Sequence, residues 1–166
     1  STLAMSSAAS NVYKRQEFGD AHGLSVQHFR LAGIYGPKRN ALAALRAGTA
    51  RRILKPGQVF SRIHVDDIAN ILFAALHSDI GTRNFSVCDD EPAPPADIVA
   101  YAAAMLGVDP PPSQNFEDAD LSEMARSFYE ENKRIRNDRI KTELGVTLSY
   151  PTYREGLTAL FKNGAY

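Results

Sequence analysis

The sequence is 166 residues long and carries 19 Lys and Arg against 19 Asp and Glu, so its formal net charge is zero. A balanced chain projects no strong field that would concentrate nucleic acid or an anionic membrane around it, which argues against a dedicated nucleic-acid-binding protein. This length is sufficient for one domain with a sizeable core.

The cysteine content and the apolar segments indicate the cellular compartment of the protein. Cys88 is the single cysteine, so an internal disulfide and a thiolate cluster for structural zinc are both excluded. No apolar stretch approaches the roughly 20 residues that cross a bilayer, and no charged-then-apolar signal segment opens the chain. These features predict a cytoplasmic protein with no membrane partner.

Residues 1–16 differ in character from those that follow. They show no clear apolar periodicity, and their end, SSAASNVYKRQ, resembles translated adapter sequence. We expect residues 1–16 to be a non-native, adapter-like tail, with a native disordered N-terminus as the alternative.

From residue 24 onward, turn signals separate apolar segments. Leu24–Leu31 lies between Gly23 and Gly33 and predicts a buried strand. The loop GIYGPKRN follows, and Asn40–Gly48 then predicts a helix that ends at the glycine.

The next segments predict a hairpin and a helix. Arg52–Leu54 and Val59–Val65 are short strand patterns separated by the turn signal KPGQ, and we expect them to pair as a β-hairpin. Asp66 or Asp67 offers an N-cap carboxylate to a helix whose apolar residues repeat with helical spacing as far as Leu76.

The second half of the chain continues the alternation. The expected elements are a strand at 83–88, a helix at 96–106, a Pro-rich loop at 108–120, a helix at 121–130, an extended piece at 133–137, and helices at 138–144 and 153–162. Strands that alternate with helices predict an α/β architecture with parallel pairing and right-handed crossovers.

Three segments carry a family resemblance. FRLAGIYGP (29–37), FSRIHVDDIA (60–69) and NKRIRNDRIKTELGV (132–146) occur in this order and are followed by YPTYREGL. Together they resemble the extended short-chain dehydrogenase/reductases, and are most similar to the YeeZ-like branch of NAD(P)-dependent epimerase/dehydratase proteins. The resemblance implies that residues 17–166 are the C-terminal half of such a protein, with part of a Rossmann-type doubly wound parallel sheet and a small α/β substrate-side lobe.

The resemblance also implies what the complete protein uses. It implies bound NAD or NADP held by a Gly-rich turn, and a Tyr, a Lys and a Ser or Thr that act on a hydroxyl or carbonyl substrate such as a sugar nucleotide. No G-x-G-x-x-G occurs, and the three catalytic residues belong upstream of Leu24. Tyr13 does not replace them, because Glu17 follows it where the lysine is required.

We therefore expect no catalytic residue in this chain, which would be an inactive part of an oxidoreductase. A non-catalytic NAD(P)-binding sensor or scaffold of the same fold is the alternative. The expected partner is a small-molecule substrate, and the complete protein is a candidate homodimer.

The retained half carries seven candidate binding residues. By resemblance, the strand-end loop that abuts the nicotinamide consists of Leu31, Ala32, Gly33 and Ile34, for which an ordinary turn is the alternative. A cation on a half-buried strand needs either a surface position or a partner, and cations at a loop can meet phosphate or carboxylate. The substrate-side candidates are Arg62, for which a surface position is the alternative, and Arg39 and Asn40, for which a solvated charged loop is the alternative.

Two departures from the family pattern concern the substrate. UDP-galactose epimerases keep an Arg two positions before Arg62 to grip the diphosphate, and Phe60 stands there in this chain. They keep an Asn where this chain has Gly33. Both departures weaken the inference of a UDP-sugar substrate without affecting the expected fold.

Other polar clusters are interpreted as structural. His64, Asp66 and Asp67 invite a metal or acid/base interpretation, but their position at a helix start favours capping, so we expect no metal site. A basic patch lies on a loop without aromatic platforms beside it, so we expect solvated side chains rather than nucleic-acid contacts at Lys133, Arg134, Arg136 and Arg139.

Overall fold

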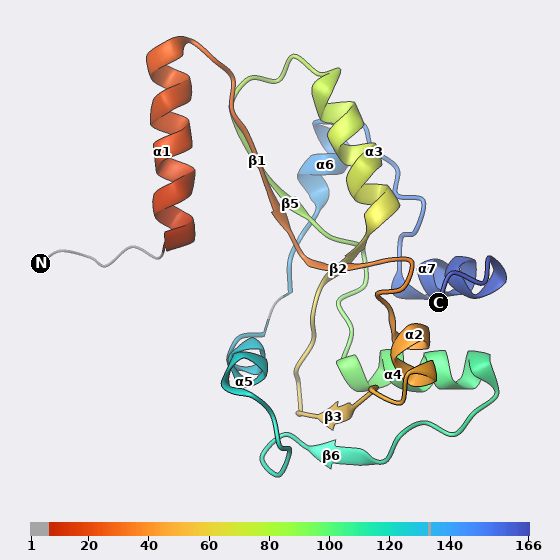
Figure 1. Ribbon diagram of the computed structural model, residues 1–166. Coiled ribbons are helices and arrows are strands. Elements are labelled where there is room, and N and C mark those ends of the chain that lie inside the picture. Colours follow the sequence, from red (N-terminus) through yellow and green to blue (C-terminus); the bar gives the residue numbers. More distant parts are fainter. Residues whose placement is uncertain (1–6, 133) are drawn as a thin grey trace, which may run out of the picture.

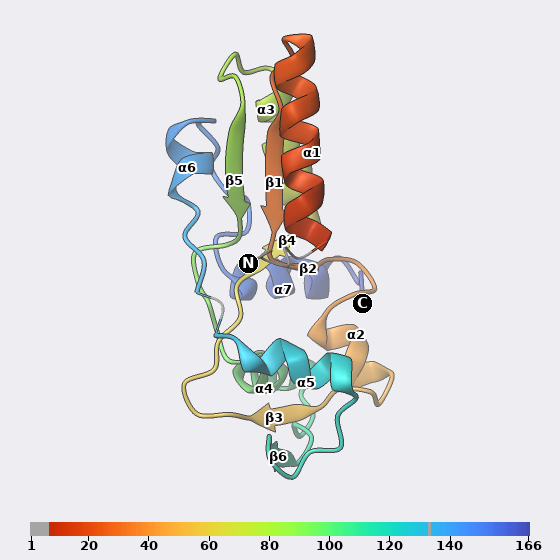
Figure 2. The same cartoon turned by 90° about the vertical axis from the view of Figure 1, so that its left-hand side faces the viewer.

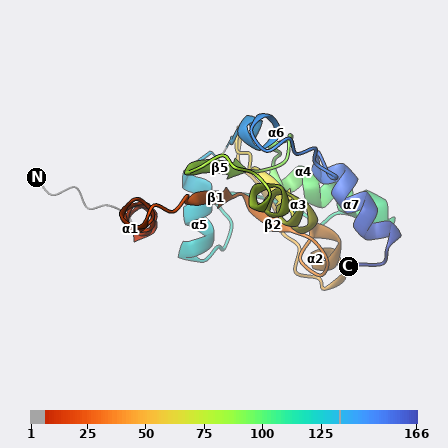
Figure 3. The ribbon, with the colours of Figure 1, turned by 90° about the horizontal axis from the view of Figure 1, so that it is seen from above.

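The computed structural model describes residues 7–132 and 134–166, and Figure 1 shows its arrangement. The first element is helix α1 (Ser7–His22), which stands to one side of the remaining elements (Figures 1 and 3). Residues 7–16 of the predicted tail belong to this helix. The adapter-like origin of residues 1–16 stays a prediction, of which residues 1–6 lie outside the described part.

The strands pair in three parallel ladders. β1 (Gln27–Leu31) pairs with β5 (Arg83–Val87), and Figure 2 shows these two strands side by side. β2 (Gly33–Tyr35) pairs with β4 (Arg62–His64). β3 (Arg52–Leu54) pairs with β6 (Ser113–Asn115). Parallel pairing requires long crossover connections, and in this chain helices supply them.

The expected hairpin between residues 52–54 and 59–65 is wrong. β3 pairs with β6 and β4 pairs with β2, so the two segments join different sheets. β6 also lies within the Pro-rich segment that was expected to be a loop throughout. In both places the partner strand lies far away in the sequence, and a local turn signal carries no information about it.

Helices cover the sheets from several sides. α3 (Val65–Leu76) and α6 (Asp138–Thr142) lie beside β1 and β5, while α2 (Ala41–Arg46), α4 (Pro95–Leu106) and α7 (Tyr153–Lys162) pack together below them (Figure 1). α5 (Glu123–Glu130) lies at the level of α4, on the side away from α7 (Figure 1). The extended piece expected at 133–137 has no strand at 134–137, and Lys133 lies outside the described residues.

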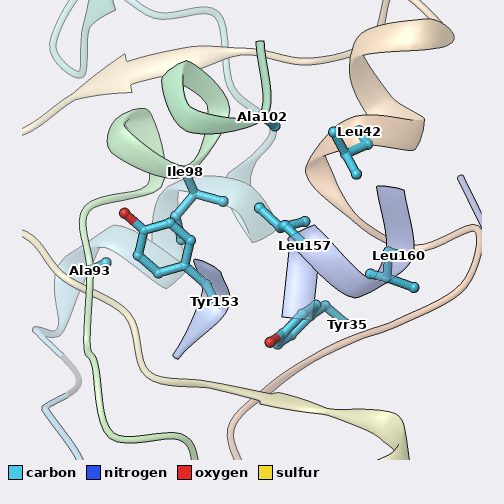
Figure 4. Packing of buried hydrophobic residues seen from close by; sticks show 8 residues of the cluster. All are labelled: Tyr35, Leu42, Ala93, Ile98, Ala102, Tyr153, Leu157 and Leu160. Atoms are coloured by element: carbon cyan, nitrogen blue, oxygen red, sulfur yellow. The ribbon is translucent and has the colours of Figure 1, made fainter. Parts of the chain in front are cut away.

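The buried apolar residues form two cores. The first, which we call the sheet core, consists of Ile63, Ile71, Phe85, Val87, Ile140 and Leu148. The second, which we call the helical core, consists of Tyr35, Leu42, Ala93, Ile98, Ala102, Tyr153, Leu157 and Leu160 (Figure 4). β2 and β4 run between them, because Tyr35 of β2 belongs to the helical core and Ile63 of β4 to the sheet core. Residues on these two short strands are therefore anchored from both sides.

Within the described part of the chain, no helix combines the length and the apolar character needed to cross a membrane.

Candidate functional site

A pocket of about 460 Å³ opens where β1 ends and β2 begins. The four residues predicted from the resemblance to abut a cofactor, Leu31 to Ile34, form a continuous part of its wall. The other lining residues come from β2, from the segment that leads into β4, and from the region around α5; they are Tyr35, Phe60, Ser61, Arg62, Phe128 and Ile135. The structure thus brings the predicted residues to one concave surface, while their contact with a cofactor stays a prediction.

The chain changes its strand partner within this wall. The Ala32 amide donates to the Val87 carbonyl at 3.0 Å, and the next amide, of Gly33, donates to the Ser61 carbonyl at 3.2 Å. The backbone therefore leaves β5 and joins β4 between two consecutive residues. In open parallel sheets, ligands bind outside the carboxyl ends of the strands where the strand connections diverge.

Gly33 lies at this crossing and is exposed. A Cβ at this position would lie 3.4 Å from the Ser61 carbonyl oxygen, which is a close but ordinary contact, so the backbone here does not require glycine.

A second pocket, of about 300 Å³, contains all three predicted substrate-side residues: Arg62, Arg39 and Asn40. Tyr35 and Arg62 line both pockets, so these two side chains form the wall between them. The rest of the second pocket is mainly apolar and belongs to the helical core, for example Ile98 and Leu157.

Arg62 is fixed at one end of its guanidinium. Its Nη1 donates to the Phe60 carbonyl at 2.7 Å and to the Ala93 carbonyl at 3.1 Å. No bond joins Nε or Nη2 to another described residue, and these nitrogens remain available. Burial lowers the pKa of this group, which the nearby Asp89 carboxylate partly offsets.

Asn40 has a structural task in addition to its place in the second pocket. Its Oδ1 accepts from the Ala43 amide at 2.9 Å, which caps α2, and its Nδ2 donates to the Gly36 carbonyl at 2.8 Å. Both ends of the amide are thereby occupied. Arg39 is exposed beside it, and its guanidinium reaches solvent.

Two buried polar residues of this region were not singled out from the sequence. Tyr35 is 8% exposed, its hydroxyl has no hydrogen-bond partner among the described residues, and burial raises its pKa. Asp89 is 1% exposed, and neither carboxylate oxygen makes a hydrogen bond of normal geometry with a described residue. Burial raises the pKa of Asp89 to about 7, although Arg62 and nearby backbone amides of Glu91 and Arg62 counteract the shift.

The sequence pattern did not predict the burial of either polar group. Asp89 stands in the run DDEPAPP, which has the composition of a solvated loop. The Asp89 amide donates to the Arg62 carbonyl at 2.6 Å, so the segment that follows β5 is held against β4, and Asp89 is buried there.

The cluster at the start of α3 is structural, but not in the way expected. The N-cap is His64, whose Nδ1 accepts from the Asp66 amide at 3.2 Å, so the prediction of an aspartate cap was wrong. Asp67 instead accepts from the amides of Ser149 and Tyr150, at 2.7 and 3.0 Å, and holds the segment before α7. Across residues 7–132 and 134–166, no group of three His, Cys, Asp or Glu side chains is placed to hold a metal ion.

No protein-family profile matches the chain. The chain is 33% identical over 138 residues to a 3-diazoavenalumate denitrifying reductase of Streptomyces. The matched region covers 77% of this chain and 44% of the relative. The chain is also 30% identical over 131 residues to Protein YeeZ of Escherichia coli K12. This matched region covers 78% of the chain and 42% of YeeZ. The chain therefore spans less than half the length of these curated relatives.

Solved structures with the same fold include two informative examples. A conserved protein of unknown function from Silicibacter pomeroyi is 54% identical with a TM-score of 0.85, over 93% of this chain and 55% of that one. A dTDP-glucose 4,6-dehydratase from Bacillus anthracis, solved in complex with NAD, is 17% identical with a TM-score of 0.72, over 98% of this chain and 51% of the dehydratase. The α/β fold and the resemblance predicted from the sequence are thereby confirmed.

Proposed function

We propose, from the premise that the chain is a relative of YeeZ with the fold of the extended short-chain dehydrogenase/reductases, that it forms the strand-end and substrate side of an NAD(P)-dependent oxidoreductase of the epimerase/dehydratase type. The complete enzyme would remove a hydride from, or deliver one to, a hydroxyl or carbonyl group of a small molecule such as a sugar nucleotide. NAD or NADP would supply the hydride chemistry.

One observation carries this proposal. The four residues predicted to abut the nicotinamide and the predicted substrate-side Arg62 line the same pocket, although 27 to 30 positions separate them in the sequence. Ala32 and Gly33 give this part of the wall two small residues, which permit the close approach of a flat ring.

The residues of this chain would position ligands and perform no proton transfer. Ala32 and Gly33 would set the distance of the cofactor ring, and Arg62 would orient the substrate. The sequence lacks the Gly-rich turn, and the catalytic Tyr, Lys and Ser or Thr are expected outside it. We therefore propose that the 166-residue chain does not turn over substrate by itself.

The test is the unfolding temperature of the purified chain with and without NAD and NADP. A ligand that binds only the folded state raises the midpoint, and at 100 times its Kd it contributes about 2.7 kcal/mol. Because the sequence lacks the Gly-rich turn, we expect a smaller rise with at least one dinucleotide, and its loss in Ala32→Phe, which adds a large side chain to the pocket wall.

The matched control is Ala104→Phe, because Ala104 is exposed on α4 and does not line the pocket. A rise that survives Ala32→Phe would place dinucleotide binding elsewhere and contradict the proposal. In a longer protein that retains the Tyr and Lys, dinucleotide binding without turnover would favour the sensor over the enzyme.

A further inference from the structure

One edge of the Arg62 guanidinium is free to donate hydrogen bonds to a ligand. Nη1 is fixed by two carbonyls, whereas Nε and Nη2 have no partner among the described residues. The side chain is half-buried in the wall between the two pockets. The nearby Asp89 carboxylate offsets part of the cost of burying this cation, and the Nε and Nη2 edge can still donate hydrogen bonds to an anionic group.

Resting on the proposed function, we infer that the substrate is a small carboxylic acid with an apolar body, and that its carboxylate binds the Nε and Nη2 edge of Arg62. The planar fork of a guanidinium donates two parallel hydrogen bonds to the two oxygens of one carboxylate. Because Phe60 and Ala93 hold the opposite edge, the fork is oriented before the ligand arrives.

Charge favours a monoanion over a diphosphate in the larger pocket. Among the described residues that line it, Arg62 alone carries a formal charge. The carboxylates of Asp89 and Asp67 act on Tyr35, which lines the same pocket, in the direction that raises its pKa, although burial is the largest cause and Arg62 acts in the opposite direction. The cation of this pocket therefore has anionic neighbours, which repel two or more ligand charges more strongly than one.

The remaining wall suits an apolar body. Leu31 is 43% exposed and Phe128 is 55% exposed, although both line the pocket. Phe60 and Ile135 complete an apolar surface beside the guanidinium. Burying such exposed apolar area against a ligand is favourable, whereas a sugar ring would leave hydroxyl groups facing apolar side chains.

The test uses the 166-residue chain without NAD or NADP. The probes are three carboxylates (cinnamate, benzoate and hexanoate), the neutral isostere cinnamamide, and two phosphorylated ligands (phenyl phosphate and UDP-glucose). Binding is followed by the Nε–H resonance of Arg62 and by calorimetry. We expect at least one carboxylate to shift that resonance, and cinnamamide, phenyl phosphate and UDP-glucose to bind at least about tenfold more weakly than that carboxylate, because hydrogen bonds to charged groups are the strong ones.

Two arginine variants refine the test. Arg62→Gln should weaken carboxylate binding by about tenfold or more, and Arg62→Lys should give an intermediate loss because it keeps the charge without the fork. Arg30→Gln is the matched control, since Arg30 is an exposed arginine of β1 that does not line either pocket. Its affinity should stay within about twofold of the unchanged chain, since exposed substitutions have small effects.

The proposal is overturned if no carboxylate shifts the Arg62 resonance, or if an amide or a phosphorylated ligand binds as well as the carboxylates. The resonance of the unchanged chain gives this answer even if Arg62→Gln fails to fold. A chain that responds to NAD or NADP but to none of the carboxylates would retain the proposed function and lose only this inference.

Discussion

The sheet core and the helical core differ in how completely their elements are covered. In the helical core, α4 buries residues on a broad face that includes Ala102 and Ala103, and both are fully buried. In the sheet core, α3 buries Ile71 and Ala75 but leaves Phe73 66% exposed and Leu76 83% exposed. α4 is rich in alanine, which allows α2 and α7 to approach closely, whereas α3 carries large apolar side chains around most of its circumference.

This difference indicates which region contributes most to stability and which region is available for binding. A core closed on several sides gains from every buried side chain, so we expect the helical core to hold the chain together. Apolar surface that remains exposed on the sheet side contributes little to stability and is available for contacts. The candidate site lies at the seam, where Tyr35 and Arg62 connect the two regions.

The largest expected effect is in the helical core. Leu157 is 1% exposed and packs among the residues shown in Figure 4, so Leu157→Ala should lower the free energy of unfolding by about 2–5 kcal/mol. The matched change on the sheet side is Leu76→Ala, which should cost less than about 0.5 kcal/mol because Leu76 is 83% exposed. Urea unfolding of both variants measures the difference. Equal losses would show that the helical core does not contribute more to stability than the exposed apolar residues of the sheet side.

The sequence predicted the helical core better than the seam. α7 was expected at 153–162 and α4 at 96–106, and the structure has them at Tyr153–Lys162 and Pro95–Leu106, because one apolar face with helical spacing specifies each helix. The hairpin failed because β3 and β4 each take a partner from a distant segment. Asp89 could not be recognised, because the burial of a carboxylate depends on tertiary contacts that no local pattern records.

The second effect concerns the seam and depends on pH. The folded-state pKa of Asp89 is about 7, above its ordinary value of 3.8. Between these values the folded chain holds a proton that the unfolded chain has lost, so stability falls as pH rises from about 4 to 7 and levels off above that. At about 1.36 kcal/mol per pKa unit, the loss amounts to a few kcal/mol.

Asp89→Asn tests this dependence because it removes the ionisation. Urea unfolding at pH 5 and pH 8 should show a smaller loss of stability in Asp89→Asn than in the unchanged chain. The control is Asp79→Asn, since Asp79 is exposed and should leave the pH dependence unaltered. If Asp89→Asn and the unchanged chain lose the same stability between these pH values, the Asp89 carboxyl does not titrate as described.

The smallest expected effect tests how tightly Tyr35 joins the two regions. A Cβ on Gly156 would lie 2.1 Å from the Tyr35 hydroxyl oxygen and 2.7 Å from its Cε2. In an exposed helix, Gly→Ala gains about 1 kcal/mol, but overpacking of a buried site costs about 1–3 kcal/mol. The ring cannot easily yield, because it is 8% exposed and rests edge-on against His64 at 5.1 Å between ring centroids.

We therefore expect Gly156→Ala to lower the free energy of unfolding by about 1–2 kcal/mol, which is less than the loss from Leu157→Ala. Adding Tyr35→Phe removes the atom in closest conflict, so the double variant should lose less than the sum of the two single variants, which urea unfolding can measure as a coupling energy. If Gly156→Ala stabilises the chain instead, the Tyr35 ring is mobile, and it cannot be the rigid wall that separates the two pockets.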